Sequence, residues 1–140
     1  MKKFKAFPVL SLIFLILALQ SCTKDDTGPN NSDARVKFIG RWSVIESWHK
    51  SAYEVTISAD PSSTGGVFIQ NFANPGGSGN PAAASVSGNT ITLDYDQTIG
   101  DGWIINGGGI YSTATGKISW DYTINDGATL YTATATYTKL

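Results

Sequence analysis

Apolar and polar residues alternate with a period of two through most of the chain after Gly40. This is the pattern of half-buried β-strands, whose successive side chains point to opposite faces of a sheet. The alternation is clearest at residues 118–124 and at residues 131–138, where Tyr and Ala alternate with Thr. We predict about eight strands, at residues 41–48, 53–59, 67–72, 84–87, 90–95, 103–111, 117–124 and 131–138.

Short turns separate most of these predicted strands. Gly88-Asn89 and Asn125-Asp126-Gly127 are tight hairpin signals between alternating runs. The three glycines at residues 107–109 lie inside a strand, which indicates a bulge, a sharp bend or a close backbone approach. Residues 33–39 predict a short helix before the first strand, with Ser32 or Asp33 as its N-cap.

Strands joined in sequence by hairpins favour an all-β, antiparallel, up-and-down barrel, which has no free strand edges. With eight strands, the interior is just filled by side chains or holds one small ligand. Small residues on the last strand, Ala133 and Ala135, opposite the large Trp120 and Tyr122 would suit a filled interior. A two-sheet β-sandwich is the alternative architecture.

The N-terminal segment has the layout of an export signal. Three lysines among the first five residues precede residues 9–19, which are uncharged and strongly apolar, as in a secretory signal peptide. This run is shorter than the about 20 residues that a membrane-spanning helix needs. Leu19-Gln20-Ser21-Cys22 resembles a bacterial lipobox, which implies cleavage before Cys22 and lipidation of its thiol. The alternative is a lone buried cysteine after an ordinary signal peptide.

We therefore expect a lipoprotein signal peptide at residues 1–21, a lipidated flexible tether at 22–33 and a β-barrel domain at 34–140. Lys24, Asp25 and Asp26 resemble the surface-export signal of lipoproteins in the Bacteroidota, whereas the alternative is an ordinary polar tether. The expected location is the outer membrane, with display at the cell surface.

The expected cleavage also changes the charge of the chain. It removes three of the ten Lys and Arg and none of the eleven Asp and Glu, so seven bases face eleven acids and the net charge is −4. A mildly acidic chain without a basic aromatic patch is not expected to bind nucleic acid.

A family resemblance supports the barrel. Gly40-Arg41-Trp42 resembles the Gly-x-Trp opening of lipocalin and wider calycin barrels, in which the Trp packs across one barrel end. The mature chain also resembles small, largely uncharacterised lipocalin-like lipoproteins of the Bacteroidota. The matching runs are residues 69–72, 86–92, 122–127 and 134–140. The resemblance implies the fold and the location rather than an activity.

The sequence offers no catalytic constellation. Cys22 is the only cysteine and is assigned to lipidation, His49 is the only histidine, and no Gly-x-Ser-x-Gly elbow exposes a serine. Zinc needs several His or Cys ligands. A calcium site at Asp94, Asp96 and Asp101, or at Asn125 and Asp126, is explained better by turn formation. Glu46 and Glu54 are a weak candidate pair for glycoside hydrolysis. We expect no enzyme activity, no metal and no cofactor.

Four residues are the candidates for ligand binding: Glu46, Trp48, Trp103 and Tyr111. Strict alternation places Glu46 on the inner face, where it could be a polar anchor paired with Arg35, Arg41 or a tyrosine hydroxyl. We favour instead a bulge at the strand end that turns Glu46 to solvent, because a buried carboxylate is costly. We expect a barrel that binds a small apolar or glycan ligand without catalysis. The alternative is a structural or accessory subunit that docks on other cell-envelope proteins.

Overall fold

A computed structural model of the protein describes residues 33–76 and 79–140. The elements in chain order are β1 (Gly40–Glu46), β2 (Tyr53–Ala59), β3 (Gly66–Gln70), β4 (Ala82–Ser87), β5 (Thr90–Leu93), β6 (Gln97–Thr98), the 3-10 turn η1 (Gly100–Gly102), β7 (Ile104–Ser112), β8 (Lys117–Asn125) and β9 (Leu130–Lys139). The predicted strands therefore match observed strands, and the short β6 is the one that the alternation did not reveal.

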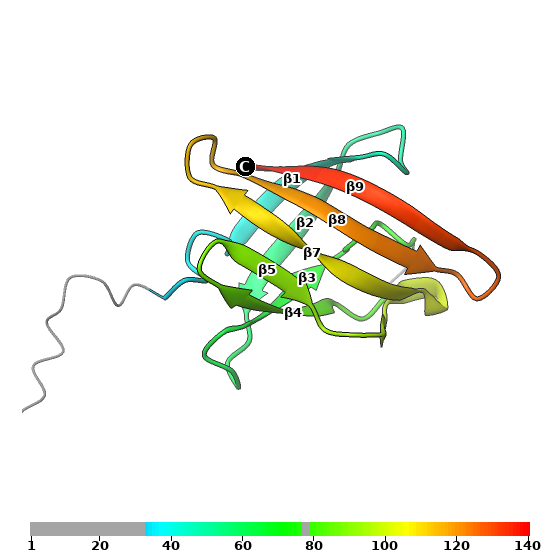
Figure 1. Ribbon diagram of the computed structural model, residues 1–140, viewed down its shortest axis with the longest axis horizontal. Coiled ribbons are helices and arrows are strands. Elements are labelled where there is room, and N and C mark those ends of the chain that lie inside the picture. The colour runs from blue at the N-terminus through cyan, green and yellow to red at the C-terminus, as the bar shows by residue number, and fades with distance from the viewer. Residues whose placement is uncertain (1–32, 77–78) are drawn as a thin grey trace, which may run out of the picture. The chain divides into compact units, whose positions relative to one another are not determined.

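The strands form one closed antiparallel barrel (Figure 1). Their order is β5-β4-β3-β2-β1-β9-β8-β7-β6, and an additional pairing of β5 with β7 closes the sheet. Eight strands make the barrel, and β6 is an extra strand that pairs with β7. The predicted up-and-down barrel is confirmed, and the two-sheet sandwich is wrong, because every barrel strand has a neighbour on both sides.

The barrel has two ends, which we name by a residue at each. The loops after β1, β3, β5 and β8 lie at the Trp48 end, and the loops after β2, β4 and β7 lie at the Phe38 end. The segment before β1 forms hydrogen-bonded turns over residues 34–38 rather than the expected helix. The amides of Phe38 and Ile39 both donate to the carbonyl oxygen of Arg35, so the hydrogen-bonded turns do not extend into a regular helix before Gly40.

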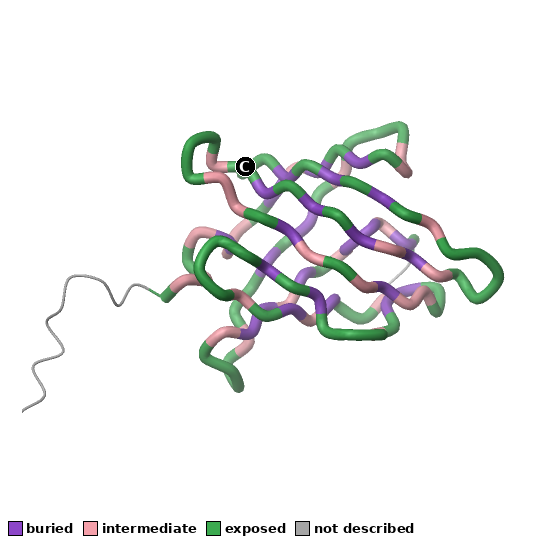
Figure 2. The backbone as a smooth tube through the Cα atoms, in the orientation of Figure 1, coloured by how far each residue is buried: buried purple, intermediate pink, exposed green. Residues whose placement is uncertain are grey.

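Buried and exposed residues alternate along the strands, as predicted (Figure 2). The buried residues are almost all apolar and form one core cluster. The largest fully buried side chains include Trp42, Trp120, Tyr137 and Phe38. The register places Ala135 opposite Trp120 and Ala133 opposite Tyr122, so small residues face large ones as expected. In the predicted strand 90–95, the alternation puts Tyr95 on the same inner face as Ile91 and Leu93. Tyr95 instead lies beyond the end of β5 and is 84% exposed, so the alternation is wrong at this residue.

The glycines of β7 allow close backbone approach where the barrel closes. A Cβ on Gly108 would lie 2.8 Å from the carbonyl oxygen of Ile91 on β5. A Cβ on Gly109 would lie 2.8 Å from the indole of Trp120, and Gly107 has a φ of +141° that L side chains rarely adopt. The predicted close approach is confirmed, and these glycines let β7 pair with β5 and β8 over the large side chains of the interior.

We predict that Gly109→Ala destabilises the barrel by about 1–3 kcal/mol, because the added methyl group overpacks the interior against Trp120. Ser119→Ala, on the exposed face of β8, should change the free energy of unfolding by less than about 0.5 kcal/mol. Urea unfolding followed by circular dichroism measures both. Equal midpoints for Gly109→Ala and the wild type would refute this account of the closure.

Candidate functional site

Glu46 is the only buried polar or charged residue of the described chain, and it points into the barrel. It is the last residue of β1, and its side chain has no exposed area. Its Oε2 atom accepts a hydrogen bond of 2.6 Å from the hydroxyl of Tyr53 and a second hydrogen bond from the hydroxyl of Tyr122. The alternation was therefore right for Glu46, and the strand-end bulge that we favoured is wrong.

The two donors come from different walls of the barrel. Tyr53 opens β2 beside Glu46, whereas Tyr122 lies in the middle of β8. Of the partners considered from the sequence, the tyrosine hydroxyls are the ones observed. Arg35 pairs instead with Asp33 at 2.7 Å, and Arg41 pairs with Glu54 at 2.6 Å on the outer surface. Glu54 thus lies outside the barrel and Glu46 inside it. The two carboxylates therefore do not share a site, and the candidate pair for glycoside hydrolysis is wrong.

The second carboxylate oxygen of Glu46, Oε1, has no hydrogen-bond donor among the described residues. His49 Nε2 is 3.6 Å away, beyond hydrogen-bonding distance, and also lies 3.3 Å from the carbonyl oxygen of Ala73. The indole nitrogen of Trp120 is buried without a partner as well. Buried polar groups normally find partners, so two unpartnered groups in one barrel need a physical explanation.

Burial changes the acidity of the tyrosines around Glu46. Desolvation, joined by neighbouring tyrosines and the hydrogen bond to Glu46, raises the pKa of Tyr53 far above its usual value. Desolvation and the hydrogen bond to Glu46 likewise raise the pKa of Tyr122. For the fully buried Tyr137, desolvation comes first and the charge of Glu46 second, and both raise its pKa. All three hydroxyls are therefore protonated at neutral pH, so Tyr53 and Tyr122 act as hydrogen-bond donors.

An aromatic cluster of Trp48, Trp103 and Tyr131 covers part of the Trp48 end. Trp48 meets Tyr131 edge-to-face at a centroid distance of 4.3 Å and Trp103 at 6.1 Å. Trp48 follows Glu46 by two residues. On β9, Ala133 pairs with Tyr122, and Tyr131 is the next inward-facing residue toward the Trp48 end. The cluster thus forms the layer between Glu46 and the end of the barrel. Tyr131 was not among the sequence candidates, although its place at the start of an alternating strand could have indicated it.

Tyr111 lies at the opposite end and does not belong to this site. Its ring meets Phe38 edge-to-face at 5.7 Å, and the ammonium nitrogen of Lys37 lies 5.7 Å from both ring centroids. Of the four sequence candidates, the structure therefore brings Trp48 and Trp103 together near Glu46 and separates Tyr111 from them.

Backbone strain gathers at the Trp48 end. Every described non-glycine residue with positive φ lies in its loops: Asn71, Ala73, Asn74, Asp96 and Asp101. Ala73 is the most unusual because it is buried with a φ of 59°, a conformation that costs about 1–2 kcal/mol in a residue with a Cβ. The turn directs Phe72 onto Tyr122 at 4.8 Å and Trp120 at 5.2 Å. No sequence signal indicated this turn, because its strained residues are not glycines.

A hollow of about 430 Å³ lies on the outer wall across β1, β9 and β8. Its lining includes the exposed Ile45 and the outward Thr134 and Thr136. Glu46 borders this hollow, but its carboxylate faces inward and does not open onto it. The outer hollow and the interior polar group are therefore separate features.

The described residues contain no group of three His, Cys, Asp or Glu side chains that could hold a metal ion. Within residues 33–76 and 79–140, no helix is long and apolar enough to cross a membrane. Cys22, Lys24, Asp25 and Asp26 lie outside the described residues. Comparison of the chain with protein-family models, curated proteins and solved structures finds no match.

We predict that the barrel unfolds at alkaline pH together with ionisation of its buried tyrosines. In the unfolded chain Tyr53, Tyr122 and Tyr137 ionise near pH 10, whereas the folded chain keeps their protons because their pKa values are raised. The raised pKa values of these three tyrosines therefore contribute fully to the free energy of unfolding below about pH 10, and this free energy falls as the pH rises further. For Tyr137 alone the loss is about 1.4 kcal/mol per pH unit.

Parallel titrations by tyrosinate absorbance and circular dichroism test this prediction. Tyr53, Tyr122 and Tyr137 should ionise only as the circular dichroism signal is lost. Ionisation of these three tyrosines with an intact fold would contradict the prediction.

Proposed function

We propose that this protein is a lipid-anchored, non-enzymatic binding protein of the bacterial outer membrane that takes a small apolar or glycan ligand at the Trp48 end. The observation that carries the proposal is a buried carboxylate with one unpartnered oxygen beneath an aromatic cluster. Ligand sites typically combine apolar and aromatic walls with a few placed polar groups. Trp48, Trp103 and Tyr131 supply the walls, and Glu46 supplies the polar group.

The contrast between the two ends supports the choice of the Trp48 end. At the Phe38 end, the indole of Trp42 donates a 2.7 Å hydrogen bond to the carbonyl oxygen of Phe38. The ammonium nitrogen of Lys139 lies 5.2 Å from the Trp42 ring, and it donates to the carbonyl oxygen of Lys37. Trp42 thus closes that end with its polar group satisfied, which is the packing expected from the Gly-x-Trp resemblance.

The packing of the interior favours the mouth of the barrel as the proposed ligand site. Phe72 and Trp120 meet across the space beneath Glu46, so side chains occupy the depth of the barrel. The loop of residues 48–52 lies outside the strands and carries both Trp48 and His49, whereas the amide of Ser47 before it still donates to the carbonyl oxygen of Thr134 on β9. A ligand that displaces this loop would reach the aromatic cluster first and Glu46 next.

A second candidate function is that of an accessory subunit that docks on other envelope proteins. The outer hollow favours it, because Ile45 is 69% exposed at its edge. This function predicts that substitutions at the Trp48 end leave partner binding intact.

We predict that Trp48→Ala weakens binding of octyl glucoside, a probe with an apolar chain and a sugar ring, by about tenfold or more. Isothermal titration below the micellar concentration measures the dissociation constant. Tyr111→Ala removes an aromatic ring of the opposite end and is the matched control, expected to bind like the wild type. Equal losses in the two variants, or no binding by the wild type, would argue against a site at the Trp48 end.

We predict that Cys22→Ala moves the protein from the membrane fraction to the soluble fraction, because lipid chains supply about 0.8 kcal/mol per buried methylene group. Replacing Asp25 and Asp26 by Ala is the matched control: the anchor stays, but added protease no longer reaches the protein on intact cells. Cell fractionation and immunoblotting measure both. Membrane retention of the Cys22→Ala protein would show that the anchor lies elsewhere.

A further inference from the structure

The buried carboxylate of Glu46 has no Lys or Arg partner among the described residues. The described ion pairs of Arg35 and Arg41 engage other acids, and His49 is the one basic side chain within 4 Å of Glu46. Burying an ion costs several kcal/mol unless an opposite charge and hydrogen bonds compensate. Two tyrosine hydroxyls compensate at Oε2, whereas Oε1 has no protein donor. A donor that also carries positive charge would compensate both the hydrogen bond and the buried charge at Oε1.

We infer that the ligand of the Trp48 end is a small organic amine, whose ammonium group binds Oε1 of Glu46 while its apolar or sugar body packs on Trp48 and Tyr131. This inference rests on the proposed binding function and names the chemical class of its ligand. An ammonium group supplies both the charge and the N–H donors that Oε1 lacks, and charge-assisted hydrogen bonds of this kind are about twice as strong as neutral ones.

The aromatic cluster suits a cation as well as an apolar body. Trp is the aromatic side chain that binds cations best, and desolvated cation–π contacts contribute about 2 kcal/mol. Trp48 and Trp103 meet edge-to-face, as do Trp48 and Tyr131, so none of these rings is stacked face to face on another within the cluster. A cation passing from the end of the barrel to Glu46 crosses this layer.

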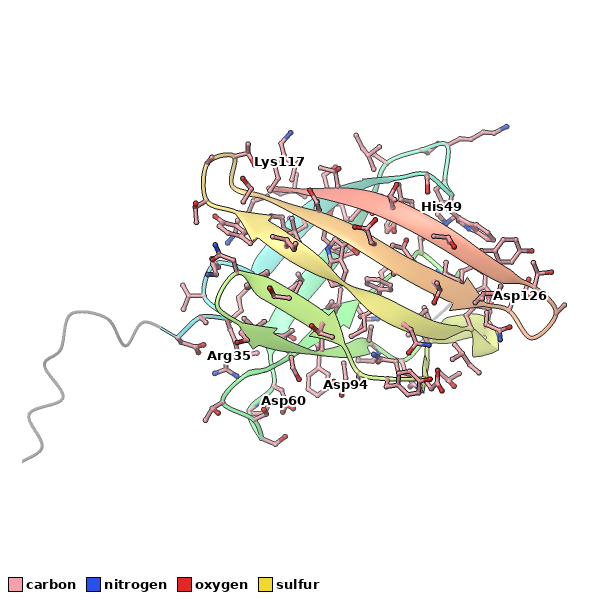
Figure 3. The ribbon with its side chains drawn as sticks, viewed as in Figure 1. Arg35, His49, Asp60, Asp94, Lys117 and Asp126 are labelled. Atoms are coloured by element: carbon pink, nitrogen blue, oxygen red, sulfur yellow. The ribbon has the colours of Figure 1, made fainter. Side chains whose placement is uncertain are left out.

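The Trp48 end is the more acidic end of the barrel, which favours cations there. Figure 3 shows Asp126 at the same end as His49, whereas Arg35, Lys117 and Asp60 lie at the other end. The acids in the loops of the Trp48 end are Asp94, Asp96, Asp101 and Asp126, and Lys50 is the only Lys or Arg there among the described residues. The Phe38 end has two acids, Asp33 and Asp60, and the other five described Lys and Arg: Arg35, Lys37, Arg41, Lys117 and Lys139. A cleft surrounded by one sign of charge raises the local concentration of the opposite ion.

His49 controls the approach to Oε1. Its side chain is 29% exposed, and its ring meets Tyr53 edge-to-face at 5.6 Å. Its Nε2 lies nearer to the Ala73 carbonyl oxygen than to Oε1, so the carboxylate oxygen keeps its lone pairs free. A change of the His49 side-chain rotamer would open Oε1 to an ammonium group and leave Trp48 in place as a wall of the site.

The test compares phenethylamine with 2-phenylethanol, a pair that differs only in an ammonium group against a hydroxyl group. Isothermal titration uses the wild-type protein, Glu46→Gln and the matched control Glu54→Gln, which changes an exposed carboxylate of the outer wall. We expect the wild type and Glu54→Gln to bind the amine at least about tenfold more tightly than the alcohol. In Glu46→Gln the difference should vanish, because the uncharged amide keeps the shape and loses the charge.

Each result decides the inference. Equal affinities for amine and alcohol in the wild type would overturn it, and so would an amine preference that survives in Glu46→Gln. In both cases octyl glucoside binding still reports on the proposed function, which fails separately if none of the three probes binds. If a thermal melt shows that Glu46→Gln does not fold, a variant with Asp94, Asp96, Asp101 and Asp126 changed to Asn replaces it. An amine preference that survives in this variant supports Glu46, because a buried charge is the one that remains, whereas a preference that vanishes assigns it to the surface acids and overturns the inference.

Discussion

Closure of the sheet between β5 and β7 is the contact on which the rest of the structure depends. Once the ring is closed, each strand has two neighbours, and the side-chain alternation of every strand is set by its partners. Closure requires the backbones of β5 and β7 to come close together, and a Cβ on Gly108 would prevent this approach. It also requires room above Trp120, which Gly109 provides. The glycines of β7 therefore do more than bend a strand: they allow the interior to contain large aromatic side chains.

The same register forces Glu46 inward. A one-residue slip would turn it to solvent, but it would also expose Trp42 and Val44, which are fully buried. Those two side chains outweigh one carboxylate, because burial of each large apolar side chain contributes about 1.5–3 kcal/mol. Tyr53 and Tyr122 then reduce the cost by donating to Oε2. The strand cannot avoid the buried charge without losing the packing of β1.

Sequence alternation predicted most of the fold because each strand of a filled barrel has one buried face and one exposed face. It failed at Tyr95, which follows the last paired residue of β5, where no neighbouring strand enforces the alternation. It also missed β6, since two residues are too short to show a period. Trp48 and Trp103 were recognisable as strand-end aromatics. Their contact with each other, and the separation of Tyr111, depended on which loops share an end, and only the strand order supplies that.

The orientation of the Glu46 side chain could not be predicted from the local sequence pattern, because two physical effects opposed each other. The desolvation cost of a carboxylate favoured a bulge, and the apolar neighbours favoured regular pairing. In the structure, regular pairing prevails, because hydroxyl donors on β2 and β8 compensate the buried carboxylate. These donors, Tyr53 and Tyr122, are 7 and 76 residues away along the chain. Partners so distant leave no local signature in the sequence around Glu46.

The two ends of the barrel differ in how completely their polar groups are satisfied, and this difference bears most directly on function. At the Phe38 end, the Trp42 indole has a backbone acceptor and a lysine above its ring. At the Trp48 end, a carboxylate oxygen lacks a donor and the loops hold strained residues such as Ala73. A chain selected only for stability would lose both features, since a glutamine and a glycine would relieve them. Backbone strain and an unpartnered carboxylate oxygen at one end are the features on which the proposed binding function rests, because local strain of this kind clusters at functional sites.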